Sequence, residues 1–343
     1  MALNSSTSPD QGLQDLNVTE CNHTEAWEWV YTIQPAYMSV ICILGVFGNT
    51  FVLCVFCFQR KQSSVADIYL GNLATADLLM LCCLPFWVVT VVHKFNWFFG
   101  EPMCQLVNII IGMNYYCSIF FLTLVSLDRY LVLARSMFVG RQRGSSAAKV
   151  ICSAIWVISF LFSLPALLFR SVRFFPDYGV EACYLDYPHE AWRVRHNFTV
   201  NIVAFLIPLS LVSYCSYHII VVLRDKQVRR SSAVGTEKKA AQLVLVVMAT
   251  FILCWLPYQT VTFFDTLYFY NVISGCLWGH GLDIGTQLTT YLGWSNSTLN
   301  PFLYVIVGKQ FRQRAKELFK QVLNREKRKT PLASVRYTEC TRV

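Results

Sequence analysis

The chain alternates between long apolar stretches and short polar ones. A helix needs about 20 apolar residues to cross a bilayer, and several stretches reach that length. They are residues 36–58, 68–92, 104–133, 148–169, 198–223, 240–264 and 283–307. We therefore expect an all-α membrane protein built as a seven-transmembrane helix bundle.

The stretch 104–133 has polar side chains at depths that lipid would not solvate, among them Asn108, Asn114 and Ser118. Such side chains normally face other protein or enclosed water, so we expect this helix to lie inside the bundle. Asp77, in the second stretch, is the acid placed well inside the hydrocarbon. Burying an acid there without partners is costly, so we expect Asp77 to have a function. The alternative is a structural role as a hydrogen-bond anchor between helices.

A different pattern follows the last apolar stretch. Its apolar positions recur at helical spacing, and basic residues occupy the opposite face, which predicts an amphipathic C-terminal helix on the membrane surface. The apolar positions are Phe311, Ala315, Leu318 and Phe319. The expected divisions are an N-terminal segment 1–35, the bundle 36–308, the amphipathic helix 309–322 and a disordered cytoplasmic tail 323–343.

Composition agrees with a membrane protein: 55% of the residues are hydrophobic and 14% charged, against about 25% charged in soluble domains. The net charge of +9 is unevenly distributed, because no Lys or Arg precedes Arg60 while eleven follow Gly308. Under the positive-inside rule the tail is cytoplasmic and the N-terminus extracellular, as in a multi-pass plasma-membrane protein. Basic residues beside membrane spans do not indicate nucleic-acid binding.

Residues expected outside the cell have the chemistry of that compartment. Glycosylation sequons begin at Asn4, Asn17 and Asn22. Of the fourteen cysteines, four fall in outer segments, where disulfides persist; they are Cys21, Cys104, Cys183 and Cys276. Four cysteines allow three pairings, and the sequence does not choose among them.

Three short motifs then converge at the expected depths. They are Asp128-Arg129-Tyr130, Cys254-Trp255-Leu256-Pro257 and Asn300-Pro301-Phe302-Leu303-Tyr304. Together they resemble the rhodopsin-like (class A) G-protein-coupled receptors over residues 30–320. Further segments resemble bradykinin receptors, and the type 2 form among them; they are residues 32–35, 65–77, 84–87, 95–100, 245–247, 264–267 and 304–312.

The resemblance implies two disulfides, Cys104–Cys183 and Cys21–Cys276. It also implies an activation switch in which Asp128 and Glu237 hold Arg129 until the sixth helix moves outward, although Glu237 could instead be a solvated residue beside Lys238. The switch residues are Asp128, Arg129, Tyr130, Glu237, Phe251, Trp255, Pro257, Asn300, Pro301 and Tyr304. The fifth span departs from the class pattern because Ser216 stands where a tyrosine is common.

A receptor of this class requires no cofactor. The resemblance does imply an allosteric sodium ion beside Asp77. The residues matching that sodium pocket are Asp77, Asn114, Ser118, Trp255, Asn296, Ser297 and Asn300. A monovalent cation beside one carboxylate and neutral oxygens is electrostatically reasonable, and it would favour the inactive state.

Ligand chemistry is narrowed by two absences in the sequence. Residues 283–307 contain no lysine for a retinal Schiff base, and Ile111 stands where amine receptors carry an aspartate. By resemblance, Asp265 and Asp283 each face a cation of a kinin peptide, unless they are ordinary rim charges. The expected ligand-binding residues are Asp265, Asp283, Arg170, Phe86, Trp87, Ile111, Tyr258, Thr262, Gln287, Tyr291 and Trp294.

Three arginines change the charge expected around the kinin peptide. Arg193 and Arg195 stand near the expected ligand site and could repel a ligand arginine, so the preferred kinin could be a variant. Arg170 is better placed to receive a carboxylate such as a peptide C-terminus.

We thus expect a receptor, not an enzyme, that binds a cationic kinin peptide and activates heterotrimeric G proteins, mainly of the Gq class, raising intracellular calcium. Further expected partners are arrestin, receptor kinases, membrane lipids and a PDZ protein at Thr341-Arg342-Val343. An angiotensin- or chemokine-like peptide receptor is an alternative. A seven-span transporter or channel is another, but it would need a chain of polar groups crossing several spans.

Overall fold

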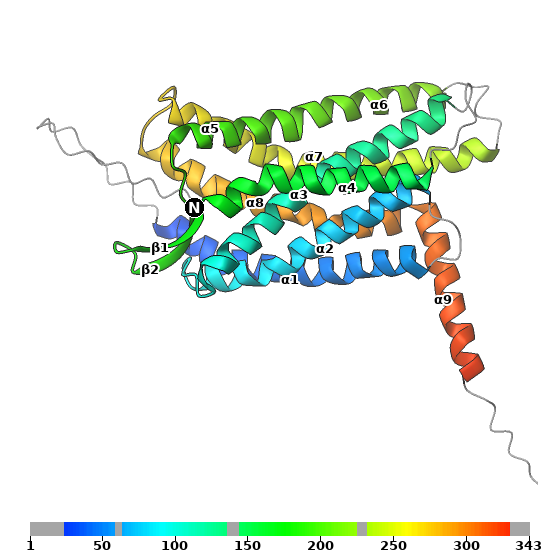
Figure 1. The fold of residues 1–343 in the computed structure, drawn as a ribbon, viewed down its shortest axis with the longest axis horizontal. Coiled ribbons are helices and arrows are strands. Elements are labelled where there is room, and N and C mark those ends of the chain that lie inside the picture. Colours follow the sequence, from blue (N-terminus) through cyan, green and yellow to red (C-terminus); the bar gives the residue numbers. More distant parts are fainter. Residues whose placement is uncertain (1–23, 59–63, 136–143, 225–231, 330–343) are drawn as a thin grey trace, which may run out of the picture.

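The structure, a computed structural model, describes residues 24–58, 64–135, 144–224 and 232–329. Long helices lie side by side along one axis (Figure 1). They are α1 (Thr24–Phe58), α2 (Val65–Val92), α3 (Gly100–Arg135), α4 (Ser145–Leu168), α5 (Glu190–Phe198) continued by the π-helix η1 (Thr199–Leu206) and α6 (Ile207–Arg224), α7 (Ser232–Phe269) and α8 (Cys276–Ile306). The continuous α5–η1–α6 rod forms one span, so the seven-transmembrane bundle is confirmed.

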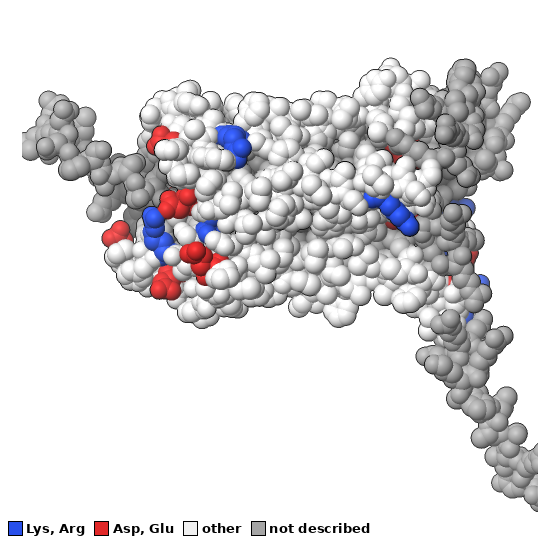
Figure 2. Space-filling view, in the orientation of Figure 1, with Lys and Arg blue, Asp and Glu red and all other residues white. Residues whose placement is uncertain are grey.

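Six of these spans in the described residues are long and apolar enough to cross a membrane on hydropathy alone. The seventh, α8, packs against α1, α2 and α7. It is less apolar because it buries polar side chains inside the bundle, including Gln287, Asn296 and Asn300. In Figure 2 the charged side chains visible on this face gather toward the two ends, with an uncharged band between them. That distribution suits a bilayer around the middle of the bundle.

Helix α3 occupies the interior, packing against α2, α4, α6 and α7. Asn108, Asn114 and Ser118 are buried there, as the polar content of this stretch predicts. Helix α3 is therefore the central helix of the bundle.

The first helix starts earlier than predicted, at Thr24 rather than near residue 36. Trp27 explains the extension, because its ring packs 6.2 Å from Tyr31 and 6.1 Å from Phe95, measured between centroids. These contacts stabilise an extra stretch of helix beyond the apolar run. Asn4, Asn17 and Asn22 lie outside the described residues.

The all-α class is confirmed, and the connection between α4 and α5 adds a short antiparallel hairpin of β1 (Arg170–Phe175) and β2 (Val180–Leu185). Gly179, with φ of +63°, completes the turn between the strands, a conformation that favours glycine. We call this end of the bundle the hairpin end (left in Figure 1).

A disulfide joins Cys104 of α3 to Cys183 of β2, with Cα atoms 5.6 Å apart. Cys276 is also disulfide-bonded; Cys21, the partner expected for it, lies outside the described residues. The described cysteines expected to be thiols within spans are all free.

The last helix, α9 (Lys309–Lys329), turns away from the bundle axis at the opposite end (Figure 1). Phe311 is buried against Phe51 and Tyr304, at ring distances of 5.8 and 6.1 Å, and Arg314 pairs with Asp67 of α2 at 2.5 Å. The helix continues to Lys329, past the predicted boundary at 322, because residues 323–329 are mostly strong helix formers. Residues 330–343, including the PDZ-like terminus, lie outside the described residues.

Candidate functional site

A cavity of about 900 Å³ opens within the hairpin end of the bundle. Helices from both sides and the hairpin contribute to its wall. Of the residues expected to bind ligand, those that line it are Trp87, Ile111, Arg170, Tyr258, Thr262, Asp265, Gln287, Tyr291 and Trp294. Segments far apart in sequence therefore meet around one space.

Two expected residues are not part of the cavity wall. Phe86 packs against Phe99 with ring centroids 4.9 Å apart, since successive helical residues point about 100° apart and its neighbour Trp87 takes the inward direction. Asp283 lies one helical turn from Gln287, nearer the hairpin end of α8; it is not among the residues that line the cavity, but it is close enough to Arg193 and Asp265 to interact with their charges. Their role in ligand binding stays a prediction.

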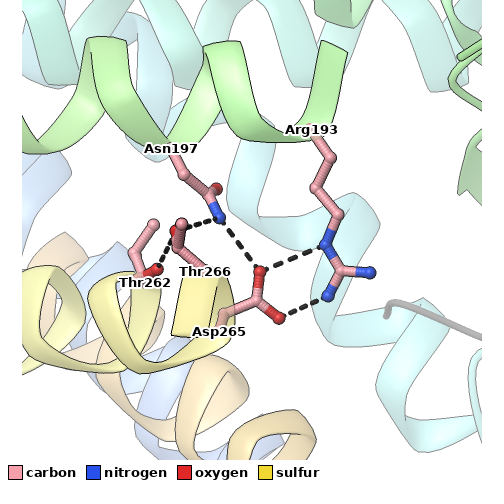
Figure 3. Close-up of polar contacts among 5 residues, drawn as sticks. All are labelled: Arg193, Asn197, Thr262, Asp265 and Thr266. Carbon is pink, nitrogen blue, oxygen red and sulfur yellow. Dashed lines mark hydrogen bonds and ion pairs between the residues drawn. The ribbon is translucent and has the colours of Figure 1, made fainter. Parts of the chain in front are cut away.

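Asp265 does line the cavity, but its carboxylate is already paired with Arg193 of α5 (Figure 3). The Nε of Arg193 donates to Oδ2 at 3.1 Å, and Nη2 donates to Oδ1. The two side chains are only 23% and 20% exposed. A two-pronged bond of this kind between partly buried charges is strong, so the acid does not present an open carboxylate to the cavity.

Asn197 completes the arrangement around Asp265. It lies one helical turn after Arg193, so both side chains point toward α7. Its amide nitrogen donates to Asp265 Oδ2 at 3.0 Å and to Thr266 Oγ1 at 3.1 Å. The sequence did not single out Asn197, although its spacing of four residues from Arg193 places both on one helix face.

Arg170 presents a positive charge elsewhere on the cavity wall. Its Nη1 donates to the backbone oxygen of Cys183 at 3.2 Å, and its Nε has no hydrogen-bond partner among the described residues. Loss of contact with bulk water lowers the pKa of Arg170 to about 10, so the guanidinium stays charged at neutral pH. Burial likewise raises the pKa of the nearby Tyr187 hydroxyl to about 12, which keeps it neutral. The cavity therefore offers a cation to an incoming carboxylate.

Aromatic side chains form the inner part of the cavity around Trp255. The rings of Tyr115 and Tyr258 lie 4.6 and 5.8 Å from it, and Phe251 continues inward at 6.3 Å. Gly293 of α8 permits this packing, because a Cβ there would lie 2.7 Å from the Trp255 ring. A ligand reaching Trp255 would therefore contact the α7–α8 interface directly.

Deeper in the bundle, Asp77 is fully buried and meets neutral donors. Asn114 donates to one carboxylate oxygen at 2.8 Å and Asn300 to the other at 2.9 Å, while Ser118 lies 3.4 Å away. Ser297 donates to Asn114 at 3.4 Å. These residues come together as expected for the sodium pocket.

Asp128 and Arg129, two of the switch residues, lie at the α9 end. Arg129 Nη2 lies 2.8 Å from Asp128 Oδ2, with side chains 10% and 7% exposed. Glu237 belongs to the helical backbone of α7, but its side chain lies outside the described residues. A second cavity of about 140 Å³ is lined by Arg129, Tyr304 and Val244, among others. The pair thus faces a hollow at the end opposite the ligand cavity.

Tyr130, the third residue of the Asp-Arg-Tyr motif, faces α6. Tyr130 packs against Tyr214 and His218 of α6, at ring distances of 5.9 and 5.7 Å. Ser216 replaces the usual tyrosine of this class, and the adjacent Tyr217 is exposed.

The Tyr304 hydroxyl has no hydrogen-bond partner among the described residues. Pro257 and Pro301 lie inside α7 and α8, where each removes a backbone donor.

Comparisons with known proteins agree with this geometry. Residues 48–304 match the family described as 7 transmembrane receptor (rhodopsin family). The chain is 46% identical to the B2 bradykinin receptor of Rattus norvegicus over 304 residues, covering 88% of this chain and 77% of that one. It is 45% identical to the human B2 receptor, covering 89% and 78% of the two chains. Identity to the human B1 bradykinin receptor is 40%, covering 89% and 87%.

Proposed function

Because the chain belongs to the rhodopsin family of seven-transmembrane receptors, we propose that its ligand is a cationic kinin peptide. Members of this family are multi-pass plasma-membrane signalling receptors and not enzymes. The supporting observation is identity of about 45% to bradykinin receptors across nearly nine-tenths of the chain. The transporter and channel alternatives do not apply to this family.

The cavity has the properties that such a ligand requires. Its volume of about 900 Å³ lies near the upper end of typical ligand pockets, which suits part of a peptide of nine residues. Trp87, Tyr258 and Trp294 offer apolar surface to proline and phenylalanine side chains. Arg170 can bind a terminal carboxylate through a charge-assisted hydrogen bond.

Signalling follows if the peptide binds one arrangement of α7 better than another. Trp255 lies on the cavity wall and, through Phe251, on the path toward the α9 end. A peptide that shifts Trp255 would favour an outward position of α7, which opens the hollow beside Arg129 to a G protein. Only a difference in affinity between the two arrangements can produce this shift. We assign the coupling mainly to the Gq class, with release of intracellular calcium.

A sodium ion beside Asp77 is part of the proposal. The carboxylate is bonded by amides and hydroxyls, and Asn296 Oδ1 and Asn300 Oδ1 are buried without a hydrogen-bond partner among the described residues. These uncommitted oxygens fit a small monovalent cation held by Asp77, Asn114, Ser118, Asn296 and Ser297. Such an ion would stabilise the inactive arrangement of the helices.

Further partners are proposed for the α9 end. Basic residues on α9 suit the anionic inner face of the membrane. Receptor kinases and arrestin would act on the tail, and a PDZ protein on Thr341-Arg342-Val343, all beyond the described residues. Each of these partners can be tested separately from peptide binding.

The test is a calcium assay in transfected cells. We expect a response to bradykinin or a close kinin variant at nanomolar concentrations, with no response to angiotensin peptides or chemokines. A response to one of those ligands alone would replace the kinin assignment with the corresponding alternative. A panel that includes the kinin lacking its C-terminal arginine identifies the preferred form.

A further inference from the structure

The carboxylate of Asp265 is nearly saturated by the receptor itself. A carboxylate has about four lone-pair directions for hydrogen bonds. Arg193 occupies two of them through Nε and Nη2, and Asn197 occupies a third (Figure 3). A ligand guanidinium needs two directions to bind in the same two-pronged way. It must therefore displace Arg193 or accept a single bond.

We propose that Arg193 determines ligand specificity by acting as a tethered cation on Asp265. This inference rests on the proposed kinin-receptor function. With Arg193 in place, a ligand arginine gains little at this carboxylate, because it only exchanges one guanidinium for another. It still loses its hydration and its rotamer freedom on binding. The receptor therefore tolerates a neutral side chain where the ligand meets the outer part of α7.

The geometry favours retention of the pair over its opening. Both side chains are about four-fifths buried and come from helices, so little additional ordering is needed to keep them together. Asn197 is buried and bridges Asp265 to Thr266, whose hydroxyl in turn bonds the Thr262 backbone at 3.0 Å. This chain of contacts anchors the carboxylate on the side where Arg193 approaches it.

The neighbouring arginine provides a matched control. Arg195 is two positions away and exposed to solvent, and its guanidinium lies 3.8 Å over the ring of Trp192. It carries the same charge in the same short helix without contacting Asp265. If positive charge alone affected ligand binding, substituting either arginine would change it. If occupation of Asp265 is what matters, only the substitution of Arg193 changes it.

The experiment measures competition binding on membranes for wild type, Arg193→Gln, Asp265→Asn, the double variant and Arg195→Gln. The probes are bradykinin and two analogues in which citrulline, a neutral isostere of arginine, replaces the first or the last residue. In wild type we expect less than about a threefold preference for arginine at either end. Arg193→Gln should raise the preference at one end to about tenfold, the size of one charged hydrogen-bond pair.

The double variant should lose that gained preference, because the freed carboxylate is gone, and Arg195→Gln should match wild type. If Arg193→Gln weakens arginine and citrulline peptides equally, Arg193 is a structural strut and the proposal is wrong. A strong preference in wild type that disappears in Asp265→Asn would also overturn it, since the acid would then be open already. Should Arg193→Gln not reach the surface, Arg193→Lys keeps the charge without the fork and should give an intermediate preference.

Failure of the proposed function has a different signature. If neither bradykinin nor its analogues bind any receptor, including wild type expressed at the surface, the kinin assignment and this inference both fall. If the peptides bind but the preferences are the same in all variants, the kinin assignment stands and only the role of Arg193 is refuted.

Discussion

Asp77 and Asp265 are both carboxylates enclosed by helices, yet their charges are balanced differently. Asp77 is fully buried and bonded by the amides of Asn114 and Asn300. Asp265 lies near the mouth of the cavity and is bonded by the guanidinium of Arg193. Neutral donors leave a net negative charge that a mobile cation can balance, whereas a tethered guanidinium balances it within the chain.

The difference separates two kinds of control over one receptor. The Asp77 cluster is sensitive to what diffuses into it, so its occupancy would follow the concentration of an ion. The Asp265 pair is sensitive to competition. A ligand cation must displace Arg193, which the chain holds beside Asp265 at a high effective concentration. Trp255 lines the same cavity as Asp265 and packs against Gly293 of α8, the helix that supplies Asn300 to Asp77.

The largest effect is expected from Asp77→Ala. The substitution removes the acceptor for the buried amides of Asn114 and Asn300, at a cost of about 3 kcal/mol. The melting temperature of the purified receptor should fall clearly. Asp77→Asn is the control, since it keeps the size and part of the hydrogen bonding while removing the charge.

Asp77→Asn also tests whether Asp77 holds a sodium ion. Replacing sodium chloride by choline chloride should raise kinin affinity in wild type and leave the variant unchanged. A sodium effect of equal size in Asp77→Asn would show that Asp77 does not hold the ion.

Gly293→Ala should have the next largest effect. The new Cβ would lie 2.7 Å from the Trp255 ring, and overpacking of this kind costs about 1–3 kcal/mol. Because Trp255 lines the cavity and Gly293 lies on α8, the helix that carries Ser297 and Asn300, we expect kinin affinity and the sodium effect to change together. If only thermal stability changes, Trp255 does not connect them. Gly281→Ala is the control, with no atoms within 4 Å of its added Cβ.

A smaller effect is expected from Asp265→Ala, which leaves the partly buried Arg193 without its carboxylate. The loss should be about 1–2 kcal/mol, reduced by the remaining solvent exposure. Arg193→Ala combined with Asp265→Ala should destabilise the receptor by less than the sum of the single changes. Melting temperatures of the four receptors form a double-mutant cycle. Strictly additive values would show that the two side chains do not stabilise each other.

The smallest effect is expected at the hairpin. Arg173 and Asp186 are 2.5 Å apart, but their side chains are 55% and 42% exposed. Water and salt screen such a pair, so Asp186→Asn should change stability by less than about 0.5 kcal/mol. A loss comparable to that of Asp265→Ala would mean that distance alone, rather than burial, sets the strength of these pairs.

The sequence predicts local and compositional features of this receptor well. Six spans follow from apolar length, the seventh, α8, is apolar along part of its surface and buries polar side chains, and Asp77 stands out as an isolated acid within α2. Asp128 and Arg129 are adjacent, so their pairing needs no knowledge of the fold. By contrast, Arg193 and Asp265 are 72 positions apart, and their contact depends on how α5 and α7 are rotated.

That rotation was not accessible from periodicity. The π-helix η1 directly after α5 shifts the register of the fifth span, so the residues facing α7 cannot be placed by a regular 3.6-residue repeat. The same limit applies to Phe86, whose ring packs against Phe99 instead of lining the cavity. The hairpin between α4 and α5 was missed because its apolar alternation is short, although the turn at residues 176–179 was a visible signal.

The most direct test of the account compares binding and signalling in the same cells for wild type and Arg129→Ala. Arg129 lies at the α9 end of the bundle, away from the cavity that is proposed to bind the peptide. We expect labelled bradykinin to bind both receptors with similar affinity, and calcium release to occur only in wild type. A full calcium response in Arg129→Ala, or wild-type receptor at the surface that binds no kinin, would contradict the account.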